Sequence, residues 1–248
     1  MFQSIKLASG LILGLALPCA LPSPSAQQPV ATTVETTKSA SLIIAEKALQ
    51  WMPESFRRVV SRNLDSLRNG INEVRAERFL LASERLTLEE DLLQRMTATV
   101  NGLQSRPKFS ETARDFGAVT QMVLLLNLPE TEADSSNKLL TLSDLIGRNN
   151  ETFRIVVYDA SEIGGIPDEV KILLDTVRQR RKRLSEPFSL EATHLTTTTI
   201  PLDPRSRLYG ISALIYSHAI NDTARVWLWI WRSANGDMSG RPPLQAQP

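Results

Sequence analysis

Two histidines and one aspartate are the residues of this chain best suited to hold a metal ion. His218 and Asp222 stand four positions apart, so on a helix they share one face. Imidazole nitrogens and carboxylate oxygens both ligate zinc, and a catalytic zinc site usually takes three protein ligands. His194, the other histidine, would supply the third ligand. The competing interpretation is a local pair in which Asp222 orients His218 through a hydrogen bond.

A similar spacing occurs in the stretch FGAVTQMVLLLNLP, residues 116–129. Gln121 and Leu125 are four positions apart and fall on one helix face. Leucine cannot ligate a metal, and the amide oxygen of glutamine is a poor partner for zinc. The residue types therefore favour core packing with a polar rim.

A run of basic residues lies in RQRRKRL, residues 178–184, where we expect a helix to end. Its members are Arg178, Arg180, Arg181, Lys182 and Arg183. Cations at the C-terminal end of a helix interact favourably with the helix dipole, which predicts a solvated basic face. The alternative is contact with an anionic membrane surface or an acidic partner. Nucleic acid is not expected, because no aromatic residues interleave with the run and the net charge is only +1.

Other catalytic patterns do not occur in the sequence. There is no Gly-x-Ser-x-Gly elbow for a serine nucleophile and no glycine-rich phosphate loop. Cys19 is the single cysteine and belongs to the N-terminal segment. The rest of the chain therefore offers neither a disulfide scaffold, a cysteine nucleophile nor a Cys-ligated zinc site.

The first 26 residues are predicted to be a Sec-type signal peptide. Lys6 precedes an apolar stretch at residues 7–17 that is too short to span a bilayer, and a Pro- and Ser-rich segment follows. We therefore expect a secreted or periplasmic protein. Lipidation at Cys19 and an uncleaved anchor are the alternatives. Residues 27–38 are expected to form a flexible linker.

Hydrophobic periodicity predicts one helical domain at residues 39–236, followed by a disordered tail at 237–248. Phe56, Val60 and Leu67 repeat at helical spacing between Pro53 and Gly70. Residues 87–90 form a capping box, which predicts the start of a further helix at this point. The expected fold class is therefore all-α, a multi-helix bundle.

The longest helix is expected to start at Asp203-Pro204 and to run to about Ala234. Its surface is apolar nearly all round, which is typical of a central helix in a bundle. At most one short strand-like segment is predicted, at residues 153–159.

Two framework motifs give the chain a resemblance to a known family. SLIIAEKALQWMP, residues 41–53, fits the pattern His-x-x-Ile-Ala-x-x-Ala-Leu-x-x-x-Pro with Ser41 in the histidine position. FGAVTQMVLLLNLP fits Leu-Gly-x3-His-x3-Asp-x3-Pro, with Gln121 and Leu125 in the metal-ligand positions. Both patterns are typical of secreted bacterial members of the zinc-dependent phospholipase C and S1/P1 nuclease superfamily, which this chain resembles.

That resemblance implies an all-α fold whose family members hydrolyse phosphoesters with zinc. Because Ser41, Gln121 and Leu125 replace ligands, we expect an exported relative that binds no metal cofactor and is not catalytic. It would bind an unidentified ligand or protein partner in a cleft near these three residues. The alternative is a phosphoester hydrolase with a reduced zinc site at His218, Asp222 and His194.

Overall fold

The computed structural model describes residues 38–79, 83–105, 108–130, 136–155, 169–193, 195 and 201–240. All of them belong to the second of the two units of the chain, residues 36–248. The predicted signal peptide, most of the predicted linker, His194 and the end of the predicted tail lie outside the described residues.

The described residues are helical and contain no strand, which confirms the all-α prediction. The long helices are α1 (Ala40–Leu49), α2 (Glu54–Ser61), α3 (Leu64–Glu73), α4 (Glu84–Gln104), α5 (Phe109–Asn127), α6 (Ser136–Asn149), α7 (Glu169–Ala192) and α8 (Arg207–Ser233). Two 3-10 turns, η1 (Ala76–Phe79) and η3 (Asn150–Thr152), complete the order. Of the strand-like segment, residues 153–155 are described and belong to no regular element.

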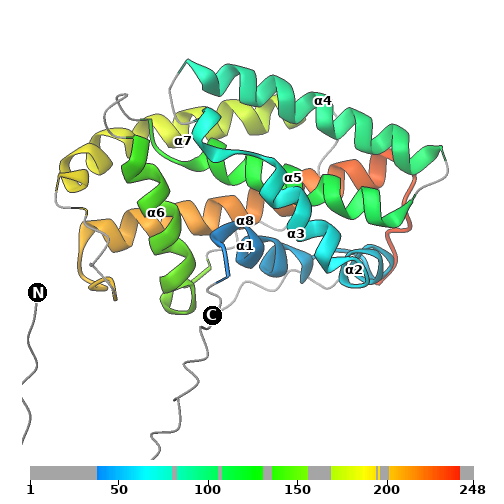
Figure 1. Cartoon of the computed structure of the whole chain (residues 1–248), viewed down its shortest axis with the longest axis horizontal. Helices are drawn as coiled ribbons and strands as arrows, with labels where there is room; N and C mark the ends of the chain where they lie inside the picture. Colours follow the sequence, from blue (N-terminus) through cyan, green and yellow to red (C-terminus); the bar gives the residue numbers. More distant parts are fainter. Residues whose placement is uncertain are drawn as a thin grey trace, which may run out of the picture. The chain divides into compact units, whose positions relative to one another are not determined.

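Helices α5 and α8 form the interior of the bundle. Both contact α1, α4 and α7, and they also contact each other. In Figure 1 they run between α4 on one side and α1 on the other. An aromatic contact joins the two helices: the ring centroids of Phe116 in α5 and Trp227 in α8 are 5.7 Å apart. Phe56 from α2 packs against both rings.

Helix α8 is long and mostly buried, but the prediction that it is apolar nearly all round is wrong. It spans 27 residues and begins after Ser206, whose side chain accepts a hydrogen bond from the Tyr209 N–H. Its buried residues include six polar ones: Ser212, Ser217, His218, Asn221, Asp222 and Thr223. No helix among the described residues is long and apolar enough to cross a membrane.

Several predicted helix boundaries also differ from the structure, among them the start of α8, which lies at Arg207 and not at Asp203-Pro204. The helix expected from Pro53 to Gly70 is two helices, because the chain leaves helical geometry at Asn63. The capping-box prediction is wrong: α4 already begins at Glu84, which places Thr87 inside the helix. Helix α7 does not end at the basic run but continues to Ala192 with Pro187 in its interior, where fully buried Phe188 holds the extra turns against the core.

The first residues of the expected tail, 237–240, lie against α2. The Ser55 hydroxyl donates to the Asp237 carbonyl at 2.8 Å, and the Glu54 N–H donates to the Ser239 carbonyl at 3.2 Å. The Trp231 indole N–H also donates to the Asp237 carbonyl, at 2.9 Å. These contacts join the end of the described chain to the helical domain.

Candidate functional site

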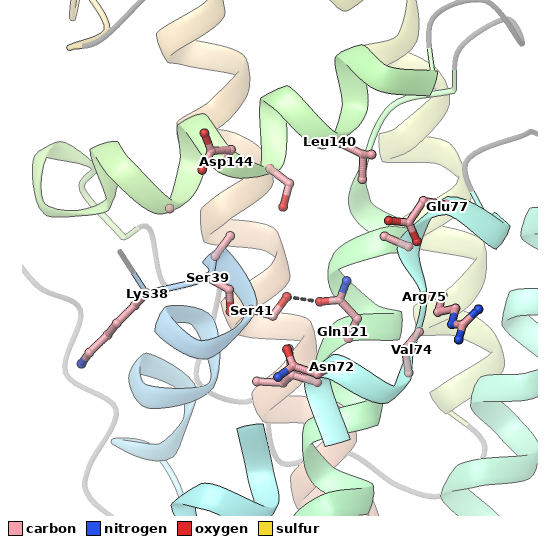
Figure 2. Close-up of a pocket in the computed structure, with 15 residues that line it drawn as sticks. Lys38, Ser39, Ser41, Asn72, Val74, Arg75, Glu77, Gln121, Leu140 and Asp144 are labelled. Atoms are coloured by element: carbon pink, nitrogen blue, oxygen red, sulfur yellow. Dashed lines mark hydrogen bonds between the residues drawn. The ribbon is translucent and has the colours of Figure 1, made fainter. Parts of the chain in front are cut away.

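A cavity of about 730 Å³ opens where α1, α3, α5, α6 and η1 meet. Its walls are mostly polar, as Figure 2 shows. The uncharged polar lining residues are Ser39, Ser41, Asn72, Gln121 and Ser143, and the charged ones are Lys38, Arg75, Glu77 and Asp144.

The start of α1 forms one wall of the cavity. The Ser39 hydroxyl caps the helix by accepting a hydrogen bond from the Leu42 N–H at 3.3 Å. Gly147 lets α6 approach this end closely, because an added Cβ would lie 3.2 Å from the Ala40 nitrogen and 3.3 Å from the Lys38 carbonyl oxygen. This packing places Ser41, in the first turn of α1, at the edge of the cavity.

Ser41 and Gln121 meet across the cavity wall although 80 positions separate them in the sequence. The Ser41 hydroxyl donates a hydrogen bond to the Gln121 side-chain oxygen, as Figure 2 shows. Because its oxygen is held in this way, the Gln121 amide group turns its NH2 away from Ser41 and offers it as a donor. Two of the three residues predicted to share a cleft therefore do so.

Leu125, the third residue, does not line the cavity. It lies one helical turn beyond Gln121 and is 2% exposed, among the apolar residues of the core. Leu125 is thus part of the core, and Gln121 is part of its polar rim, as the residue types had predicted for this helix. The cavity residues of α3, η1 and α6 were not foreseen, because only the tertiary packing of three separate elements turns their polar side chains toward one space.

The charged lining residues differ in how they are paired. Lys38 forms an ion pair with Glu46 at 2.8 Å, and Asp144 with Arg148 at 2.8 Å. Arg75 and Glu77 form no ion pair with any other described residue. The cavity can thus offer a polar ligand a guanidinium and a carboxylate that have no ion-pair partner among the described residues, together with several neutral hydrogen-bonding groups.

His218 and Asp222 lie elsewhere, in contact with Arg180 of α7. One guanidinium nitrogen of Arg180 is 2.8 Å from His218 Nδ1, and the other donates to Asp222 Oδ2 at 2.6 Å. Asn127 of α5 donates to the same carboxylate oxygen at 3.0 Å. A cation already bridges the histidine and the aspartate, so this donor set does not suit a metal ion held between them.

The surroundings of His218 favour its neutral form. Burial lowers the pKa of His218 to about 4, and the neighbouring Arg180 charge acts in the same direction, whereas Asp222 partly opposes it. A neutral imidazole accepts a hydrogen bond at Nδ1 from Arg180. Among the residues that the structure describes, no three histidine, cysteine or acidic side chains gather as a metal site. His194 lies outside that part of the chain.

The basic run is only in part the solvated face predicted for it. Arg180 is 17% exposed at its side chain and Arg181 5%, and both point into the protein. Arg178 pairs with buried Glu89, and Arg181 donates to Glu130 at 2.9 Å. The run lies in the interior of α7, so the predicted interaction with a helix C-terminus is also wrong. Arg178, Lys182 and Arg183 are exposed, as the prediction of a solvated face requires.

Comparison with known proteins does not assign the chain to a family. No family model, curated protein or solved structure matches this sequence or its fold.

Proposed function

We propose that this chain is an exported, non-catalytic relative of the zinc-dependent phospholipase C and S1/P1 nuclease-type hydrolases. Its role is to bind a ligand or partner in the cavity lined by Ser41 and Gln121. The observation that carries the proposal is the hydrogen bond between these two side chains. In the family that this chain resembles, the two equivalent positions hold metal ligands. Ser41 and Gln121 meet at one cavity, as two ligands of one site would.

The composition of the cavity wall supports binding through hydrogen bonds. Gln121, Asn72 and Ser143 offer neutral donors and acceptors, and Arg75 and Glu77 offer single charges. A small polar ligand matches such a wall, since a site of this kind takes its specificity from a few convergent polar groups. Export is supported by the N-terminal residues alone.

Metal content and turnover together test the non-catalytic part of the proposal. The chain, expressed with added zinc and then dialysed, is expected to retain less than about one zinc per chain. It is also expected to leave bis(p-nitrophenyl) phosphate intact with any divalent metal. A zinc-bound water would have a pKa near 7, and its loss removes the nucleophile of that chemistry. About three retained zinc ions, or metal-dependent turnover, would refute the proposal.

Ligand binding is tested with phosphocholine and thymidine 5′-monophosphate, which represent the product classes of the resembling enzymes. Binding of either should raise the unfolding temperature of the chain. The Gln121→Leu variant should lose that rise, because it removes the amide that faces the cavity. Gln94→Leu, at an exposed glutamine of α4, is the matched control and should keep it. Equal behaviour of the two variants would show that binding occurs elsewhere.

A further inference from the structure

Arg85 is a buried cation whose donors have no acceptor in the described part of the chain. The residue is the second of α4 and is 1% exposed. Its Nε and both terminal nitrogens are buried, and none of them donates a hydrogen bond to another residue that the structure describes. Burial lowers the pKa of Arg85 to about 10, so the guanidinium still carries its charge at neutral pH. A buried charge without a hydrogen-bonding partner is strongly unfavourable.

Two carboxylates of this cluster, Glu130 and Glu89, accept hydrogen bonds from other arginines. Arg181 faces Arg85 closely enough for its charge to lower the pKa of Arg85, and Glu130 and Glu84 act in the opposite direction. Glu130 accepts a hydrogen bond from Arg181 at 2.9 Å. Glu89 accepts from Arg178 with both of its oxygens. The acidic side chains of this cluster thus leave the donors of Arg85 unused.

Arg181 adds a second unused donor at the same place. The residue is 5% exposed, and its NH1 makes no hydrogen bond to a described residue, although it lies 3.9 Å from Glu89. The N-terminal end of α4, where Arg85 stands, contributes the positive end of a 21-residue helix, and its N-cap Ser83 makes no side-chain capping bond. Unused donors of two guanidinium groups and the positive end of a helix dipole therefore come together at the start of α4.

We propose that a small inorganic oxyanion, of the phosphate or sulfate type, binds between Arg85 and Arg181 at the start of α4. Guanidinium groups match the oxygens of such ions with paired N–H donors. Because both arginines are almost completely buried, the ion is a small free one and not the headgroup of a lipid. The site joins α4 to α7 and is separate from the cavity at Ser41 and Gln121, so it does not depend on the proposed function.

Thermal unfolding at constant ionic strength tests this site. Replacing sodium chloride by sodium phosphate or sodium sulfate should raise the unfolding temperature of the full chain by about 3–5 °C. The Arg85→Met variant removes the donors and should lose this rise. Arg183→Met, at an exposed arginine of α7, is the matched control and should keep it.

A rise that is absent from the wild type, or equal in wild type and Arg85→Met, would overturn the proposal, because oxyanions also stabilise proteins through general exclusion from their surface. A second measurement does not depend on the stability of any variant. Crystals of the wild type soaked in selenate should show an anomalous peak within hydrogen-bonding distance of Arg85. A selenate peak that is absent there would equally overturn the proposal.

Discussion

Gly70 and Gly117 bring the backbones of α3 and α5 into direct contact. A Cβ added at Gly70 would lie 1.8 Å from the Arg114 carbonyl oxygen, and one added at Gly117 would lie 2.0 Å from the Leu67 carbonyl oxygen. Each glycine thus faces the backbone of the opposite helix. This approach holds Gln121, one turn beyond Gly117, beside the end of α3 that lines the cavity.

Gly117→Ala should therefore destabilise the protein by about 1–3 kcal/mol, because a backbone carbonyl cannot move aside as a flexible side chain can. The measurement is the free energy of unfolding from urea titrations followed by circular dichroism. Gly102→Ala is the matched control in α4, where an added Cβ meets nothing within 4 Å. It should leave stability unchanged or raise it by up to about 1 kcal/mol through helix propensity. Equal effects of the two substitutions would contradict the close helix contact.

Ser41 and Gln121 should be energetically coupled. In a double-mutant cycle with Ser41→Ala and Gln121→Ala, we expect a coupling free energy of about 1 kcal/mol, as is typical for a side-chain hydrogen bond. Additive effects of the two substitutions would show that the bond contributes nothing in solution. The pair Ser41 and Gln94 serves as the control and should be additive, since the exposed Gln94 lies on α4.

Arg180 should contribute to stability through Asp222. Arg180→Met leaves the Asp222 carboxylate, 2% exposed at its side chain, with Asn127 but without a cation. Breaking a buried ion pair in this way is expected to cost about 3 kcal/mol. Arg58→Met breaks the exposed pair with Glu54 and should cost no more than about 0.5 kcal/mol. If chemical denaturation gives similar losses in the free energy of unfolding for both variants, the buried Arg180 pair stabilises the fold no more than an exposed pair does.

His218 should make the fold less stable in mildly acidic solution. Its pKa is about 4 in the folded chain against an ordinary value of 6.5. Between these two pH values the unfolded chain binds the proton and the folded chain does not, so stability falls as the pH is lowered from 6.5 to 4. Below pH 4 both states are protonated and this loss ends. With partial solvent screening of the group, the loss amounts to about 2 kcal/mol.

The His218→Gln variant isolates this effect from the titration of carboxylates. A glutamine does not titrate, so the stability difference between wild type and variant should change across that pH window and be constant above it. Unfolding free energies measured at several pH values check this. A difference that does not vary with pH would show that the pKa of His218 is the same in the folded and the unfolded chain.

The local sequence was a good guide to the helices and a poor guide to their ends. The period of Phe56, Val60 and Leu67 correctly indicated buried helical faces. The sequence did not indicate that α7 continues past Pro187. The helix does continue, because the burial of Phe188 outweighs the backbone hydrogen bond that the proline removes. The spacing of His218 and Asp222 correctly placed both on one face but could not identify their partner, which comes from α7.

The sequence by itself determined the all-α class, the presence of most helices and the separation of apolar from polar faces, because these depend on residues three and four positions apart. Only the tertiary structure decided which polar residues meet. The packing of helices brought Ser41 to Gln121, which are 80 positions apart in the sequence. The same packing placed Leu125 in the core and directed Arg180 and Arg181 inward. Such contacts depend on how closely whole helices approach, and at Gly70 and Gly117 that approach is set by the absence of a single carbon atom on each helix.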